Sequence, residues 1–292
     1  MLATRPLRPG SDFGVKVIGL DLGRETAQSI RRELIHLFHR HQIIRISGQA
    51  MNLHDYARFG AWFGNPHPHA VEKVRVAGFP GVTLLTNADD ETRNTAAYWH
   101  TDNTYEAEPA TATMLWAEIV PAQGGETMMA DMYAAYTSLP ETMKRRIANM
   151  RSVNGWYKRD EGFFKKELPH LSEESLRQMG INTHPLVKRH PVTGRLALYD
   201  VTGSSYGIEG MPPDEGLDLL KELAAHALKP EYLLAVGYKV GDIAAWDTLA
   251  TLHSATPHAN PSAGASMLRR MYRISVKGAS PYAVMHAEYA VS

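Results

Sequence analysis

The sequence contains no cysteine among its 292 residues. Disulfide bonds, iron–sulfur clusters, cysteine-ligated zinc and cysteine nucleophiles are therefore excluded. The chain also has no surplus of charge, because 31 Lys and Arg residues balance 31 Asp and Glu residues. This balance argues against non-specific nucleic-acid binding, which depends on an excess of basic side chains.

Long apolar runs are absent as well. No stretch approaches the roughly 18 consecutive apolar residues that a membrane-spanning helix needs. Residues 1–23 lack the apolar segment of a signal peptide. We therefore expect a cytoplasmic protein with neither a membrane nor a nucleic acid as partner, and the sequence leaves open whether it forms a homo-oligomer.

Short periodic segments fill most of the chain. Helical spacing predicts helices at 25–41, 53–64 and 213–228, and two helical pieces within 131–150. Alternation or β-branched composition predicts strands at 14–22, 43–48, 82–87, 111–120, 196–201, 232–240, 242–246 and 267–277. Together they predict a single, mainly β domain over residues 1–292, an antiparallel sandwich or jelly roll with flanking helices.

Residues 151–185 do not follow this pattern. They mix charges and aromatic side chains without a clean period, and a long irregular segment inside a compact domain is usually functional or mobile. We expect a lid here, with Trp156, Tyr157, Phe163 and Phe164 as its aromatic residues. Plain packing of these aromatic side chains is the alternative.

Histidine is frequent, with 14 residues, and its spacing singles out YWHTDNTY, residues 98–105. His100 and Asp102 are two positions apart, so an extended chain points both side chains to one side. GDIAAWDTLATLHSATPHA, residues 241–259, offers His253 and His258 as candidates for a third ligand. Two histidines, one carboxylate and open positions form the ligand set that handles Fe(II) and O₂, although zinc hydrolases use the same residue types.

The segment MLRRMYRISV, residues 267–276, decides between these metals. In a strand, Arg269 and Arg273 share one face with Met271, while Arg270 and Tyr272 share the other. Two arginines on one face of an apolar strand are costly unless they meet anions. The pattern predicts two anion clamps, and an edge strand with solvated arginines is the alternative.

These motifs together resemble the taurine dioxygenase-like family of Fe(II)/2-oxoglutarate-dependent oxygenases, from about residue 15 to residue 277. The resemblance implies a double-stranded β-helix (jelly-roll) core. It also implies a reaction in which 2-oxoglutarate and O₂ are converted to succinate and CO₂ while a small organic substrate is hydroxylated or otherwise oxidised. WHTD then supplies the Fe(II) ligands His100 and Asp102, and GDIAAWDTLATLH supplies His253. Because Asp102 is present, the resemblance excludes radical halogenases, which lack this carboxylate.

The same resemblance assigns the ligands of the organic molecules. GGET places Thr127 on the distal carboxylate of 2-oxoglutarate, and Arg269 takes the place of the arginine that clamps this carboxylate. Arg273 and His69 take the places of side chains that meet the anionic group of the substrate. Asn103 stands where the family has a small apolar residue, and we expect it to contact the substrate too.

Three departures from the family indicate that taurine is not the substrate. Glu72 stands where an aromatic residue is expected, Ala96 replaces an asparagine, and Asn103 replaces a small apolar residue. A separate departure, WDTL at 246–249 in place of Trp-Asp-Asn-Arg, removes an Asn–Arg hydrogen-bond pair near the third ligand but not the ligand itself. We expect a small anionic substrate whose far end is polar or cationic if Glu72 and Asn103 face the cavity. A zinc hydrolase and a non-catalytic, cupin-like binding protein are the alternatives, but neither explains Thr127 together with two arginines.

Overall fold

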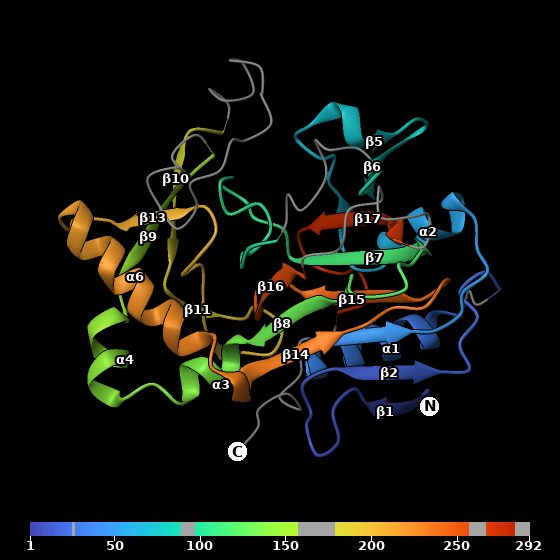
Figure 1. Ribbon diagram of the computed structural model, residues 1–292. Helices are drawn as coiled ribbons and strands as arrows, with labels where there is room; N and C mark the ends of the chain where they lie inside the picture. The colour runs from blue at the N-terminus through green and yellow to red at the C-terminus, as the bar shows by residue number, and fades with distance from the viewer. Residues whose placement is uncertain (25–26, 89–96, 157–178, 257–266, 284–292) are drawn as a thin grey trace.

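The computed structural model describes residues 1–24, 27–88, 97–156, 179–256 and 267–283 (Figure 1). Its helices are α1 (Gln28–His41), α2 (Leu53–Gly60), α3 (Met132–Thr137), α4 (Glu141–Ile147) and α6 (Pro213–Ala227), with short 3₁₀ helices η1 (Glu72–Val74) and η2 (Pro230–Tyr232). Its strands are β1 (Ala3–Pro6), β2 (Val15–Ile18), β3 (Ile43–Ile46), β4 (Asn65–Pro66), β5 (Arg75–Val76), β6 (Phe79–Thr86), β7 (Ala112–Ile119), β8 (Thr127–Asp131), β9 (Arg151–Gly155), β10 (Ile181–Pro185), β11 (Val187–Arg189), β12 (Leu196–Leu198), β13 (Ser205–Ile208), β14 (Leu233–Val236), β15 (Ile243–Asp247), β16 (Thr251–Ala255) and β17 (Arg270–Lys277).

The largest sheet has nine strands. Its order is β1-β2-β3-β15-β7-β17-β6-β5, and β4 pairs with the end of β17. The central strand β15 is buried at every position because both faces of the sheet are covered. Ala244 and Trp246 point to one face, whereas Ile243 and Ala245 point to the other.

A three-stranded sheet, β14-β8-β16, lies against the inner face of the large sheet. The core between them joins Leu115, Trp246 and Met271 from the large sheet to Met129 and Val236 from the small one. Two facing sheets, antiparallel except for the parallel pair β2 and β3, make the jelly-roll core that the sequence predicts. The prediction of a mainly β fold is confirmed.

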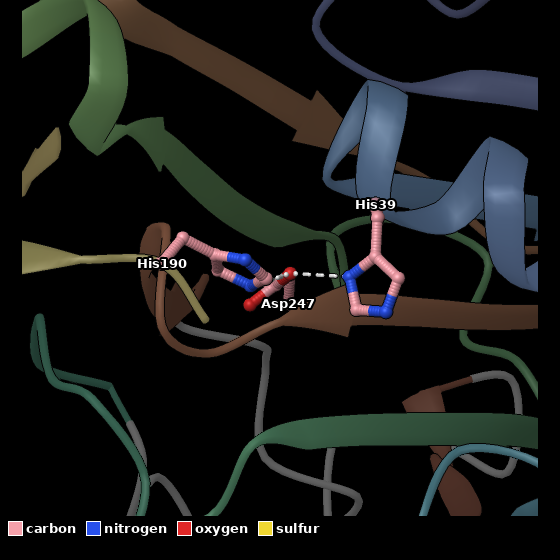
Figure 2. Close-up of side chains that lie close together, drawn as sticks. All are labelled: His39, His190 and Asp247. Atoms are coloured by element: carbon pink, nitrogen blue, oxygen red, sulfur yellow. Dashed lines mark hydrogen bonds and ion pairs between the residues drawn. The ribbon is translucent and has the colours of Figure 1, made fainter. Parts of the chain in front are cut away.

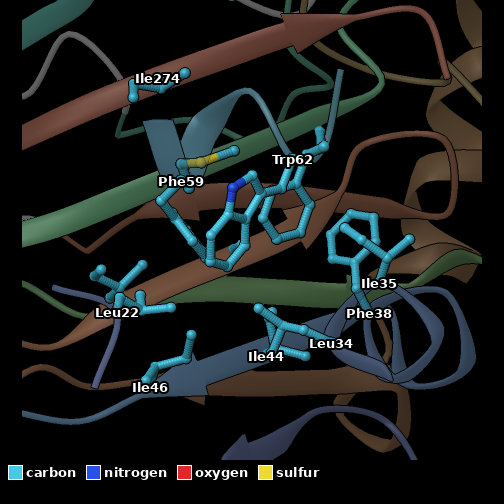
Figure 3. Packing of buried hydrophobic residues seen from close by; sticks show 14 of the residues in the cluster. Leu22, Leu34, Ile35, Phe38, Ile44, Ile46, Phe59, Trp62 and Ile274 are labelled. Atoms are coloured by element: carbon cyan, nitrogen blue, oxygen red, sulfur yellow. The ribbon is translucent and has the colours of Figure 1, made fainter. Parts of the chain in front are cut away.

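Helices α1 and α2 cover the outer face of the large sheet. Phe38 from α1 and Phe59 from α2 pack with Ile44 and Ile274 of the sheet (Figure 3). Figure 1 shows α3, α4 and α6 at the opposite end of the molecule, beside a second three-stranded sheet, β10-β9-β13. A separate buried cluster around Leu220, Leu223 and Ile147 joins these helices. Helices outside the sheets were predicted, and they are confirmed.

Several predicted boundaries are wrong. The helix predicted at 53–64 ends at Gly60, where α2 gives way to tight turns that carry Trp62 and Phe63 into the core. Segment 151–185 is not irregular throughout, because β9 at its start pairs with β10 at its end. The remaining part of the predicted lid, residues 157–178, lies outside the described residues. Within the described ranges, no helix is both long and apolar enough to cross a membrane.

Candidate metal centre and co-substrate site

His100 and His253 are brought together by main-chain pairing. The N–H of His100 donates to the carbonyl of His253 at 2.9 Å, and the N–H of His253 donates back at 3.0 Å. The segment around His100 therefore extends the sheet β14-β8-β16, next to β16. His253 lies in the middle of β16. Asp102 follows two positions after His100, and the ligand atoms of all three side chains lie within 4.8 Å of one another.

The tautomer of His100 suits a metal ligand. Its Nδ1 lies 2.8 Å from the carbonyl oxygen of Tyr98 and so carries the ring proton. Nε2 then offers a lone pair, and it lies 3.7 Å from Oδ1 of Asp102. Nε2 of His253 lies 3.5 Å from Oδ2 of the same carboxylate. Within the described part of the chain, Nδ1 of His253 has no hydrogen-bond partner.

Burial sets the charge state of these ligands. It lowers the pKa of His100 to about 4 and the pKa of His253 to about 3, so both imidazoles are neutral at pH 7. Burial alone would raise the pKa of Asp102, but Arg273 and the two imidazoles outweigh it and hold this pKa well below its usual range. Two neutral imidazoles and one carboxylate are in the protonation states that a divalent metal requires.

Two further side chains hold the Asp102 carboxylate. Thr113 on β7 donates its hydroxyl to Oδ2 at 2.7 Å, and Arg273 on β17 donates to Oδ1 at 2.7 Å. Thr113 itself lies 2.8 Å from the hydroxyl of Ser275. The sequence analysis missed Thr113. Strand alternation could have found it, because Thr113 shares the inward face of β7 with Leu115.

Thr127 and Arg269 lie at a second corner of the site. Thr127 opens β8, and its hydroxyl lies 2.8 Å from the phenol oxygen of Tyr238. Arg269, only 7% exposed, precedes β17, and its Nε donates to the carbonyl of Gly125 at 3.4 Å. Burial lowers the pKa of Arg269, and Tyr238 is its electrostatic neighbour. No carboxylate pairs with Arg269 in the described ranges, so this buried cation lacks an anion. Tyr238 was missed because no local motif marks it.

The two arginines therefore lie in different parts of the site. Arg269 lies beside Gly125, whereas Arg273 reaches Asp102. Their shared face is the inner one, with Met271 buried between them. Arg270 points to the other face and pairs with Glu118. The alternation predicted for this strand is confirmed, and the alternative of an edge strand is wrong because β17 pairs on both sides, with β6 and β7.

His69 lies near Arg273. Its Nδ1 accepts the N–H of Val71 at 3.1 Å, so Nε2 carries the proton and can donate it in a hydrogen bond. Burial, and then the charge of Arg273, lower the pKa of His69 to about 4. His69 is therefore a neutral donor beside a cation at pH 7.

Two residues expected at the far end of the substrate have other partners. Asn103 is buried with φ at +61°, and its amide donates to Tyr105 at 3.1 Å and to Glu106 at 2.6 Å. The side chain of Glu72 is 84% exposed and pairs with Arg75 at 3.1 Å. The expectation that Glu72 faces a cavity is wrong, because η1 directs it to solvent. Ala96 and His258 lie outside the described residues.

A jelly roll that gathers two histidines and one aspartate, together with a buried arginine that pairs with no carboxylate of the described residues, defines an Fe(II)- and 2-oxoglutarate-dependent dioxygenase. Residues 3–274 match the family described as "Taurine catabolism dioxygenase TauD, TfdA family", and the chain belongs to this family. It is an oxidoreductase that uses Fe(II), 2-oxoglutarate and O₂. The resemblance seen in the sequence is confirmed.

Known relatives share this chemistry. The chain is 28% identical over 267 residues to the alpha-ketoglutarate-dependent 2,4-dichlorophenoxyacetate dioxygenase of Cupriavidus pinatubonensis, covering 86% of this chain and 91% of the relative. It is 29% identical over 249 residues to an alpha-ketoglutarate-dependent sulfate ester dioxygenase of Pseudomonas putida, covering 83% and 79%. The crystal structure of AAD-2 in complex with Mn(II) and N-oxalylglycine superimposes with a TM-score of 0.79 at 25% identity, covering 98% of this chain and 100% of that one.

Proposed function

We propose that His100, Asp102 and His253 hold Fe(II), that Arg269 and Thr127 hold the distal carboxylate of 2-oxoglutarate, and that the enzyme oxidises a small anionic substrate. The observation that supports this proposal is a pair of inward-facing arginines at separate places around one candidate metal site. Arg269 is buried and pairs with no carboxylate in the part of the chain that the structure describes, whereas Arg273 lies 2.7 Å from Asp102. One arginine serves the co-substrate, which leaves the other for the substrate.

Fe(II), held by His100, Asp102 and His253, would supply the oxidising chemistry when bound with 2-oxoglutarate and O₂, with succinate and CO₂ as the co-products. The residues of the chain supply position. Arg269 fixes one end of 2-oxoglutarate, and Thr127 with Tyr238 adds hydroxyl groups to the same corner. Asp102 is itself held by Thr113 and Arg273, so its orientation is set before any ligand arrives.

Arg273 and His69 support an anion-binding role. Only Nη2 of Arg273 donates a hydrogen bond to Asp102, and no other hydrogen bond joins this guanidinium to a described residue. His69 adds a neutral N–H donor beside it. A carboxylate, sulfonate or sulfate fits a guanidinium and an imidazole donor, and the oxidised carbon would lie beyond that group. The two relatives act, by name, on a phenoxyacetate and on sulfate esters, which are anionic molecules.

Asn103 acts on the substrate site indirectly, through the loop that carries it. Its amide is already bonded to Tyr105 and Glu106, so we expect it to shape the loop that faces the substrate. The balance of acidic and basic residues supports a small molecule rather than a nucleic acid as partner. We expect residues 1–292 to act as one catalytic unit, with a lid or insertion at residues 151–185.

The test uses purified protein with Fe(II), ascorbate and 2-oxoglutarate. Succinate release is measured with matched pairs of compounds, an anionic member against its neutral ester or alcohol. We expect the anionic members to stimulate succinate release, and Arg273→Ala to remove that preference. Arg270→Ala is the matched control, because Arg270 lies on the same strand but pairs with Glu118 on the other face. Equal stimulation by neutral compounds would exclude the anion site, and hydrolysis without succinate would indicate a zinc hydrolase.

A further inference from the structure

A second cluster of two histidines and one aspartate lies away from the metal centre (Figure 2). His39 comes from α1, His190 follows β11, and Asp247 ends β15. Nδ1 of His39 lies 3.2 Å from Oδ2 of Asp247, and Nε2 of His190 lies 2.9 Å from the same oxygen. All three side chains are buried. The residue types are those of the metal centre, so the cluster raises the question of a second metal.

The tautomer of His190 argues against a metal at this cluster. Its Nδ1 accepts two main-chain N–H groups, from Val192 and Thr193, each at 3.1 Å. Nδ1 therefore has no proton, and the ring proton of a neutral imidazole lies on Nε2. Nε2 is the atom that faces Asp247, and a protonated nitrogen has no lone pair for a metal. Two N–H donors at Nδ1 also keep the proton from moving there.

Asp247 fixes the turn between β15 and β16. Its Oδ1 accepts the N–H of Leu249 at 3.0 Å, and its main-chain oxygen accepts the hydroxyl of Thr251 at 2.7 Å. Its own N–H donates to the carbonyl of Gln42 at 2.8 Å. The carboxylate thus shapes the turn from inside while His39 and His190 hold it from two other elements.

This turn leads to His253. β16 begins at Thr251, so His253 is the third residue of the strand that leaves the turn. Trp246, next to Asp247, also packs its ring against the imidazole of His253, with 4.9 Å between ring centroids. A shift of Asp247 would therefore reach His253 by two routes, along the main chain of the turn and through the indole ring.

We infer that His39, Asp247 and His190 form a positioning network, not a second metal site, and that this network sets the place of His253 by anchoring the turn before β16 to α1 and to the end of β11. The inference rests on the proposed role of His253 as a metal ligand. Loss of a supporting contact around a metal site costs metal affinity even though the ligands themselves remain.

The experiment compares two substitutions of His39 in the full-length protein. His39→Asn keeps an N–H donor near the position of Nδ1, whereas His39→Leu fills similar space without one. Mn(II) binding is measured by titration calorimetry, with the visible spectrum of the Co(II)-loaded protein as a second readout. We expect one Mn(II) per chain, an affinity about 10- to 100-fold weaker in His39→Leu, and near-parental affinity in His39→Asn. The Co(II) spectrum should change only in His39→Leu.

Three results would overturn the inference. Two Mn(II) per parent chain, falling to one in His39→Leu, would make the cluster a metal site. Equal Mn(II) affinity in the parent and both variants would make the network a matter of packing, as would equal losses in the two variants. If His39→Leu does not fold, Asp247→Asn replaces it, because the amide keeps an oxygen for Leu249 but loses the charge. Failure of the proposed metal centre itself would be visible in the parent, as absent Mn(II) binding, whereas failure of the network is visible only in the variants.

Discussion

The two clusters contain the same residue types and differ at the nitrogen remote from the carboxylate. Nδ1 of His100 faces a carbonyl oxygen, so its Nε2 is free to bind a metal. Nδ1 of His190 faces two N–H groups, so its Nε2, which lies 2.9 Å from Asp247, carries the ring proton. Composition and spacing cannot separate these cases, because the main chain around each ring decides between ligand and hydrogen-bond donor.

The carboxylates differ in the same way. Asp102 is held by side chains, those of Thr113 and Arg273. Asp247 is held by the main chain of its own turn and by two histidines. The first arrangement leaves charged groups for ligands, and the second uses its groups within the protein.

The largest effect should come from removing a ligand of the metal centre. His253→Ala should abolish both Mn(II) binding and turnover. The fold should remain, because the main chain of β16 at residue 253 still pairs with residue 100. Circular dichroism and calorimetry would measure the fold and the binding. His258→Ala is the control and should behave like the parent. The reverse result, with activity lost only in His258→Ala, would make His258 the third ligand.

Removing the co-substrate clamp should have the next largest effect. Truncating one partner of a buried charge pair costs about 2–5 kcal/mol, so Arg269→Ala should raise the KM for 2-oxoglutarate by about 30-fold to several thousand-fold. Mn(II) affinity should stay the same, which separates this corner from both histidine clusters. Steady-state kinetics at saturating primary substrate would measure the effect. An unchanged KM would move the clamp to Arg273.

Acid should destabilise the metal-free protein through the metal centre. The pKa of His100 is about 4 when folded and 6.5 when unfolded, so the unfolded chain binds more protons between these values. Stability therefore falls as pH drops from about 6.5 to about 4, by on the order of 3 kcal/mol for His100 alone. Chemical denaturation of chelator-treated protein at several pH values would show it. His100→Gln should flatten the dependence, and an equally steep loss in that variant would assign the effect elsewhere.

The smallest effect should come from the hydroxyl that orients Asp102. Thr113→Val keeps the shape but removes the donor, and Mn(II) affinity should fall by about 10-fold. Thr113→Ser keeps the hydroxyl and should bind like the parent. Equal affinities for the valine and serine variants would show that Arg273 alone orients the carboxylate.

The sequence predicted what depends on local spacing. Alternation put His100 beside Asp102, and it put Arg269 on the same face as Arg273, because the period of two in a strand is a property of neighbouring residues. The family resemblance, not periodicity, selected His253 as the third ligand. The main-chain pairing of residue 100 with residue 253 depends on sheet register between distant segments and was not predicted. The packing of Tyr238 on Thr127 depends on register in the same way and carried no signal.

The second cluster shows where sequence reasoning ends. His39, His190 and Asp247 come from three elements that share no motif, so only the assembled fold brings them together. Glu72 was misplaced for a related reason. A substitution relative to a family shows which position changed, but the partner of the new side chain, here Arg75, is set by the local loop.

The main-chain bridge between His100 and His253 also has a consequence for the order of events in the cell. The metal centre is closed by a contact between segments that are synthesised far apart in time, and β17, which supplies Arg273, is made later still. Contacts of such long sequence separation form late, because the intervening chain must first be made and ordered. We therefore expect the iron site to be completed only after the segments around residues 100 and 253 have both been made and have paired.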